Sequence, residues 1–218
     1  MVSLCYAQSL DGSITARRGQ PLALSGPEST RLTHRLRAAH DAILVGIGTV
    51  LADDPRLNVR LVKGKDPQPV VLDSRLRIPM NANLLRGRLP WIATTDRADR
   101  EKGALLEGQG AYLFYLPQDP QGGVSLPALL GHLASLGVKS LMVEGGARVI
   151  TRFLTDRLVD IVVLTIAPLF IGGQMGVESI LAIDSGSDEL AFPRLRDFGS
   201  TRLGDDLITW GRLLWSEI

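Results

Sequence analysis

"DAILVGIGTVLADDPRLNVR", residues 41–60, passes from an apolar run through two glycines into a loop with two aspartates and two arginines. The run at 42–46 is short and unbroken by polar residues. Such a run is typical of a strand whose two faces are both covered, as in a parallel sheet. Six other segments are strand candidates, at 2–8, 69–73, 91–95, 111–116, 140–144 and 160–168, and most of them are nearly continuous hydrophobic runs.

Segments with helical spacing alternate with these strands, at 25–39, 125–137 and 146–158. Alternation of strands and helices predicts an α/β fold with a mostly parallel central sheet and helices on both faces. The last stretch, 200–218, carries turn residues between strand-like segments and no helix long enough for a crossover connection. We therefore expect antiparallel strands at the C-terminal end of the sheet.

Composition limits the class of protein. The 218 residues carry a formal net charge of +1, with 45% hydrophobic and 22% charged residues, which fits one globular domain spanning 1–218. The balanced charge gives no basis for expecting a nucleic-acid partner, and no apolar run is long enough to span a membrane. Cys5 is the only cysteine, so a reducing, cytoplasmic location is expected. The three histidines are too scattered to predict a metal site.

Three strand exits carry residues suited to a ligand. Residues 46–49 combine two glycines with a threonine, residues 73–75 read Asp-Ser-Arg, and residues 144–146 pass from Glu through a glycine pair into a helix. In α/β sheets, ligands bind beyond the carboxyl ends of strands, and a helix N-terminus favours an anion. Each junction alone is also explained by tight turn packing, but three together predict a dinucleotide with an additional phosphate, namely NADP.

Five segments resemble a known family: "AQSLDGSIT" (7–15), "VGIGTVLADDPRLNVR" (45–60), "VVLDSRLRIP" (70–79), "VEGGARV" (143–149) and "IAPLFIGG" (166–173). The chain resembles the riboflavin biosynthesis reductase family, which comprises the RibD C-terminal reductase domain and its single-domain relatives. The resemblance implies a dihydrofolate-reductase-like fold, a homodimer, and NADPH-dependent reduction of the ribosyl side chain of a ribosylaminopyrimidine 5′-phosphate to ribityl.

The resemblance also implies the site residues. Residues expected to contact the cofactor are Ala7, Thr49, Asp53, Ser74 and the segment that includes Gly146, Ala147 and Arg148, to which the strand exits add Gly145 and Arg75. Residues expected to contact the substrate are Arg37, Leu57, Arg60 and Glu144. The arginines suit a sugar phosphate and the carboxylates suit ribose hydroxyls. The candidates for orienting the reactants or delivering the proton are Asp11, Asp53 and water, and the sequence leaves this choice open.

Departures from the family pattern leave the substrate open as well. Many bifunctional members have a lysine in the first strand, where this chain has Cys5, and Pro21 and Ala23 replace a polar substrate contact and an aromatic residue. Two alternatives therefore remain: a reductase of the same fold acting on a pteridine or another heterocycle, and a non-catalytic NADP-binding relative.

Overall fold

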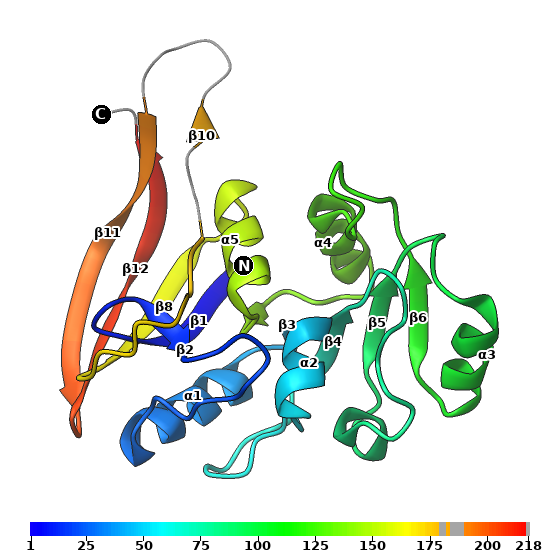
Figure 1. Ribbon diagram of the computed structural model, residues 1–218, viewed down its shortest axis with the longest axis horizontal. Coiled ribbons are helices and arrows are strands. Elements are labelled where there is room, and N and C mark those ends of the chain that lie inside the picture. The colour runs from blue at the N-terminus through cyan, green and yellow to red at the C-terminus, as the bar shows by residue number, and fades with distance from the viewer. Residues whose placement is uncertain (179–181, 184–189, 217–218) are drawn as a thin grey trace. The chain divides into compact units, whose positions relative to one another are not determined.

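A computed structural model describes residues 1–178, 182–183 and 190–216. The chain divides into two compact units, the first formed by Met1–Thr33 with Met142–Ile218 and the second by His34–Leu141. Figure 1 shows the elements of each unit along the chain. The expectation of one domain over 1–218 stays a prediction. No helix in the described part of the chain is long and apolar enough to cross a membrane.

The second unit contains a parallel sheet in the order β3-β4-β5-β6. Its strands are β3 (Ala42–Gly46), β4 (Gln68–Leu72), β5 (Trp91–Thr94) and β6 (Tyr112–Tyr115). All five residues of β3 and of β4 are buried, as the unbroken apolar runs predict. Its helices are α2 (Ile47–Asp53), the 3-10 turn η1 (Asn83–Arg86), α3 (Arg100–Gly108) and α4 (Leu126–Ser135), and it contains the C-terminal half of α1 (Pro27–Ala39).

Helices cover both faces of this parallel sheet. Leu113 and Phe114 are neighbours on β6 and therefore point to opposite faces. Leu113 belongs to the same buried apolar cluster as Leu106 of α3. The ring of Phe114 lies 4.6 Å from the ring of His132 in α4. The predicted arrangement of helices on both faces of a mostly parallel sheet is thus confirmed.

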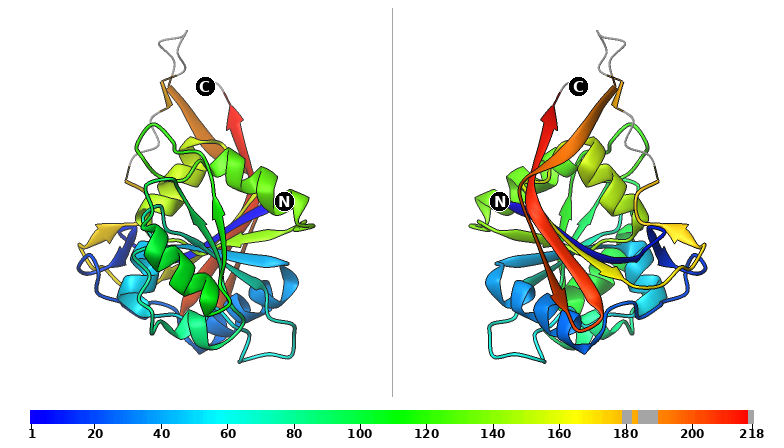
Figure 2. Two further views of the ribbon diagram at one scale, coloured as in Figure 1. Left: turned by 90° about the vertical axis from the view of Figure 1, so that its right-hand side faces the viewer. Right: turned by 90° about the vertical axis from the view of Figure 1, so that its left-hand side faces the viewer.

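The first unit contains the strand order β10-β11-β12-β8-β1-β7. Strands β1 (Val2–Ser9) and β8 (Ile161–Ala167) are parallel, whereas β12 (Asp206–Ser216) runs antiparallel to both β8 and β11 (Leu190–Leu203). The long hairpin of β11 and β12 is the orange and red ribbon in Figure 2. The expected antiparallel C-terminal strands are confirmed, with 217–218 outside the described residues. The remaining elements are β2 (Ser13–Thr15), β7 (Leu141–Val143), α5 (Ala147–Thr155), β9 (Gln174–Met175) and β10 (Ala182–Ile183).

Helices α2 and α3 are absent from the sequence-based expectations. Gly46 ends β3 in an extended conformation and serves as the N-cap of α2, and Ile47 and Val50 bury one face of this short helix. The seven residues of α2 are too few to show a helical period clearly. Helix α3 begins at the Asp99 cap, whose side chain accepts hydrogen bonds from the N–H groups of Glu101 and Lys102. That cap is a sequence signal that would have located α3.

Candidate functional site

The carboxyl ends of β3, β4 and β5 meet along one edge of the second unit. Gly46 is in register with Leu72, and Leu72 with Ala93. Because the three strands are parallel, the segments that leave them begin at the same edge, where α/β proteins bind ligands. Those segments carry the predicted Thr49, Ser74 and Arg75.

The turn after β4 holds Ser74 in a fixed position. The Asp73 side chain is fully buried, and its Oδ2 accepts a 2.8 Å hydrogen bond from the N–H of Ile78. The Thr95 hydroxyl donates a 2.9 Å bond to the Ser74 carbonyl. Arg75 is exposed and, in the described part of the chain, has no hydrogen bond or ion pair. The turn therefore presents a hydroxyl and an uncommitted guanidinium side by side in the sequence.

Helix α2 places Thr49 half-buried at this edge, one residue after the exposed Gly48. A Cβ built on Gly48 meets no atom within 4 Å, so the space beside this glycine is open. A ligand can therefore approach the backbone closely at Gly48. The threonine hydroxyl beside it offers both a donor and an acceptor.

The two aspartates at the end of α2 have different environments. Asp54, in the left-handed conformation at φ 40°, accepts bonds from the N–H (2.7 Å) and the side-chain amide (2.9 Å) of Asn83. Asp53 is exposed and has no such partner in the described chain, yet desolvation by the surrounding protein raises the pKa of its carboxyl. Asp54 thus has a structural role, whereas Asp53 remains available for chemistry.

The two arginines predicted to contact the substrate both donate hydrogen bonds to one residue. Arg37 in α1 donates through Nη1 to the Asn58 carbonyl at 3.2 Å, and Arg60 donates through Nη1 to the Asn58 side-chain oxygen at 3.4 Å. The backbone N–H of Arg60 donates to Nδ1 of the buried His34 at 3.2 Å. Leu57, which directly precedes Asn58, is 2% exposed and has a left-handed backbone conformation at φ 51°. Two guanidinium groups are thus held near one asparagine, which sequence alone did not indicate.

In the first unit, Asp11 has all its acceptor capacity engaged. Its carboxylate accepts from the Ser9 and Ser13 hydroxyls and from the N–H groups of Ile171 (3.0 Å) and Gly172 (2.7 Å). These bonds, that of Ser9 foremost, hold the pKa of Asp11 well below its usual range. A carboxyl group in this state retains its charge and does not deliver protons near neutral pH. The geometry therefore favours a positioning role for Asp11.

Helix α5 begins at a site suited to an anion. Gly146 is its N-cap and provides no side-chain bond to the first N–H groups of the helix, contributed by Ala147 and Arg148. A Cβ on Gly145 would lie 2.4 Å from the Cβ of Val149, so close packing requires glycine there. The nine residues of α5 add their dipole at this N-terminus. The glycine pair therefore has both a packing role and the geometry of a phosphate site.

Cys5 and Glu144 are electrostatic neighbours in the first unit. Burial, and secondarily the charge of Glu144, raise the pKa of the Cys5 thiol well above its usual range. Cys5 is 5% exposed and behaves as a small apolar residue. Ala7, two residues along β1, is half-buried and paired with Thr165 of β8. The first strand thus presents no positive charge at this position.

A family model described as the RibD C-terminal domain matches residues 1–209. The chain belongs to this family. It is 39% identical to the 2,5-diamino-6-ribosylamino-4(3H)-pyrimidinone 5′-phosphate reductase of Methanothermobacter thermautotrophicus over 95% of each chain. It is also 39% identical to the reductase of the same name from Archaeoglobus fulgidus, over 77% of this chain and 80% of the relative.

Solved structures agree with this membership in the RibD C-terminal domain family. A riboflavin biosynthesis reductase of Saccharomyces cerevisiae superposes with a TM-score of 0.74 at 29% identity, covering 98% of this chain and 89% of the yeast chain. A dihydrofolate reductase of Enterococcus faecalis superposes with a TM-score of 0.53 at 13% identity, covering 97% of this chain and 96% of that one. The predicted family and dihydrofolate-reductase-like fold are confirmed, and the family is one of reductases.

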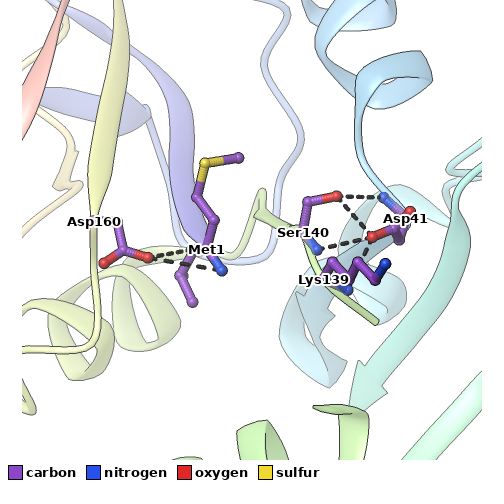
Figure 3. A network of polar contacts seen from close by, with 6 residues as sticks. Met1, Asp41, Lys139, Ser140 and Asp160 are labelled. Carbon is purple, nitrogen blue, oxygen red and sulfur yellow. Dashed lines mark hydrogen bonds and ion pairs between the residues drawn. The ribbon is translucent and has the colours of Figure 1, made fainter. Parts of the chain in front are cut away.

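A groove of about 350 Å³ lies at the opposite, amino-terminal edge of the second unit's sheet. His40, Lys65, Arg88 and Trp91 are among its lining residues, and none of the predicted site residues lines it. Asp41 at its rim accepts bonds from the N–H groups of Lys139 and Ser140, both at 2.9 Å (Figure 3). This contact fixes the loop that precedes β7.

Thr95 is a functional candidate that sequence reasoning missed. Its buried hydroxyl fixes the Ser74 carbonyl, and it follows β5 at the same edge as the predicted residues. The second threonine of the strand segment "WIATT" was the available signal, because a hydroxyl directly beyond a parallel strand lies at the ligand edge. In the described part of the chain, no three His, Cys, Asp or Glu side chains form a metal-binding group.

Proposed function

We propose that this protein uses NADPH to reduce the ribosyl side chain of 2,5-diamino-6-ribosylamino-4(3H)-pyrimidinone 5′-phosphate to ribityl, as a step of riboflavin biosynthesis. The observation that carries the proposal is the pair of guanidinium groups that Arg37 and Arg60 bring to Asn58. Paired arginines suit the phosphate of such a substrate, because planar guanidinium groups bind phosphate oxygens through paired hydrogen bonds. Near-complete coverage by the Methanothermobacter reductase supports the diaminopyrimidinone as the substrate.

Each unit, considered by itself, carries residues that suit part of NADPH. In the second unit, Arg75 beside Ser74 suits the 2′-phosphate, and the open space at Gly48 beside Thr49 suits a closely approaching ligand. In the first unit, the uncapped N-terminus of α5 at Gly146 suits the pyrophosphate. The cofactor supplies the hydride, and the residues of the chain bind and orient the two reactants and deliver a proton.

Proton delivery falls to Asp53 rather than Asp11. Reduction of an imine-like carbon requires a proton at the adjacent heteroatom, and a carboxyl with a raised pKa is a better donor than one held ionised. Asp53 has the raised pKa and lacks a structural partner in the described chain, whereas Asp11 is held as a carboxylate by surrounding donors. For Glu144 we keep the role that the family resemblance implies: its carboxylate accepts a hydrogen bond from a ribose hydroxyl of the substrate.

A homodimer is part of the proposal. The hairpin of β11 and β12 exposes four large apolar side chains: Phe192, Phe198, Leu207 and Trp210. Phe198 is 61% exposed, and the Trp210 ring packs against Gly199, where a Cβ would lie 2.5 Å from the ring. Apolar surface gathered on one hairpin is typical of a protein interface. We expect a second copy of the chain to cover it.

The test is NADPH oxidation, followed by absorbance, by the purified protein. The diaminopyrimidinone, its deaminated counterpart and dihydrofolate are supplied in parallel. We expect turnover of the diaminopyrimidinone, with Arg60→Ala lowering kcat/KM while NADPH still binds. Turnover of dihydrofolate alone would establish the pteridine alternative. Tight NADPH binding without oxidation by any of the three would establish a non-catalytic relative, and either result would overturn the proposal.

A further inference from the structure

The loop that follows β8 is fastened to the turn that follows β1. The N–H of Leu10 donates to the Leu169 carbonyl at 2.9 Å, and the N–H of Gly173 donates to the Ser13 hydroxyl at 3.0 Å. Between these two bonds, the N–H groups of Ile171 and Gly172 donate to the Asp11 carboxylate. Four hydrogen bonds therefore fix residues on both sides of position 170.

Phe170 lies at the centre of this fastened loop with its side chain 78% exposed. A single exposed apolar residue needs no explanation by itself. Here, however, both neighbours of Phe170 are hydrogen-bonded through their backbones, so the ring is presented by a backbone that is already ordered. Among the described aromatic residues of the first unit, Phe170 is the one that directly follows a parallel strand with its ring in solvent.

The place of Phe170 is that of a ligand contact. Strands β1 and β8 are parallel neighbours, with Ser9 in register with Ala167, so Asp11 and Phe170 leave the same edge of the sheet. Ligands of α/β folds gather at this edge. Aromatic side chains stack on planar rings, and an ordered platform avoids the entropic cost of fixing the ring when the ligand binds.

We propose that Phe170 stacks on the pyrimidine ring of the substrate and sets the preference for a planar heterocycle, and that Asp11 is the positioning residue that holds the loop in its binding conformation. This inference rests on the proposed function. It gives the Ser-Leu-Asp-Gly turn and the "IAPLFIGG" segment a joint role. Asp11 suits that role because a carboxylate is an acceptor only, and every neighbour that it contacts here donates.

Steady-state kinetics on the purified protein test the inference. We expect Phe170→Ala to raise KM for the diaminopyrimidinone about tenfold, as loss of an aromatic stack on a base does, while Kd for NADPH changes less than about twofold. Phe170→Trp keeps a ring and is expected to retain a KM near that of the unaltered protein. Leu105→Ala removes another solvent-exposed apolar side chain, 61% exposed on α3, and serves as the control with unchanged kinetics.

Whether Asp11 acts through Phe170 is tested by combining substitutions at the two positions. In Asp11→Asn, the amide N–H₂ group faces backbone donors, so the loop is released and KM rises as in Phe170→Ala. Because Asp11 acts through Phe170, the double variant is expected to be no worse than either single variant. Asp119→Asn is the matched control, since Asp119 also accepts from two backbone N–H groups of a turn, at 2.9 and 2.7 Å. We expect it to change stability without changing KM.

Several outcomes would overturn the inference. Phe170 is too exposed for its substitution to impair folding. An unchanged KM in Phe170→Ala would therefore show that the ring makes no stacking contact with the substrate. A rise in Kd for NADPH instead assigns the ring to the nicotinamide, and dissociation of a dimer assigns it to the subunit interface. An additive double variant removes the positioning role of Asp11. An inactive unaltered protein overturns the proposed function as well, whereas an active one with unaffected variants overturns this inference alone.

Discussion

The Thr95 hydroxyl donates a 2.9 Å hydrogen bond to the Ser74 carbonyl, and this bond joins the segment after β5 to the segment after β4. Thr95 is fully buried, so the bond is shielded from water. It holds the turn that contains Ser74 and the exposed Arg75. The position of two proposed cofactor contacts therefore depends on a residue that needs no contact with the cofactor itself.

Substitution Thr95→Val removes this bond while keeping the side-chain shape. We expect a loss of about 1–2 kcal/mol of stability, because the Ser74 carbonyl loses its donor. Binding of NADPH should weaken several-fold, since Ser74 and Arg75 are no longer held in place. Thermal unfolding and a fluorescence titration with NADPH measure the two effects. Normal NADPH affinity in a destabilised variant would confine Thr95 to a structural role.

Arg75 is expected to determine the preference for NADPH over NADH. Arg75→Ala should raise KM for NADPH about 10- to 100-fold, the loss expected for a charge-assisted bond to a phosphate, and leave KM for NADH unchanged. Arg77→Ala is the matched control, because Arg77 lies two residues away and its guanidinium is engaged 4.0 Å from Asp73. An equal effect of Arg75→Ala on both cofactors would contradict a 2′-phosphate contact.

Arg60 is expected to bind the substrate phosphate. Arg60→Ala should raise KM for the phosphorylated substrate about 10- to 100-fold but have little effect on its dephosphorylated counterpart. Arg60→Lys keeps the charge without the planar fork and should be intermediate. Arg56→Ala tests a second exposed arginine of the same loop, for which we expect normal kinetics. Equal losses on both substrates would place Arg60 away from the phosphate.

The sequence predicted those parts of the fold that depend on hydrophobic pattern. The apolar runs at 42–46 and 69–73 correspond to β3 and β4, because strands buried on both faces have continuous apolar character. Helix α2 was not predicted, because its two buried residues, Ile47 and Val50, are too few to define a period. Buried strands were thus more predictable from the sequence than short helices.

The site was predictable only in part. Strand exits and motifs predicted Ser74, Arg75 and the glycine pair before α5 as cofactor contacts, and these stay predictions. They did not distinguish Asp53 from Asp11, because both are aspartates in segments that follow strands and the hydrogen-bond donors around them are not visible in the sequence. Those donors include Ile171 and Gly172, which are about 160 residues from Asp11 along the chain. Hydrogen bonds over such separations have no local sequence signal.

Asp53 should control the pH dependence of turnover. The raised pKa of its carboxyl means that the acid form persists to higher pH, so kcat should fall as pH rises through that pKa. Asp53→Asn should lower kcat about 100-fold or more and remove this pH dependence, as loss of a general acid does. Asp54→Asn is the matched control: we expect a lower Tm, because its bonds to Asn83 weaken, but the same pH profile. A retained profile in Asp53→Asn would identify another proton donor, water included.

The same raised pKa has a consequence for stability. A carboxyl that is harder to ionise in the folded chain binds more protons there than in the unfolded chain. Stability is therefore lost as pH rises from the unfolded pKa through the folded one. Above both values, at neutral pH, Asp53→Asn should melt at a higher temperature than the unaltered protein. A lower Tm at neutral pH would show that the Asp53 carboxylate is stabilised by contacts in the fold.

Gly145 is expected to have a packing role that determines cofactor binding. A Cβ there would lie 2.4 Å from the Cβ of Val149, so Gly145→Ala must displace the first turn of α5. We expect a loss of about 1–3 kcal/mol and weaker NADPH binding, because the N–H groups after Gly146 move with that turn. Gly131→Ala is the matched control, since a Cβ on Gly131 of α4 meets nothing within 4 Å and alanine favours a helix. That variant should raise Tm and leave NADPH binding unchanged. Normal NADPH binding by Gly145→Ala would have two explanations. If its calorimetric Tm is also unchanged, the first turn of α5 accommodates the methyl group without loss of stability. If its Tm falls while that of Gly131→Ala does not, the start of α5 is displaced but has no part in binding the cofactor.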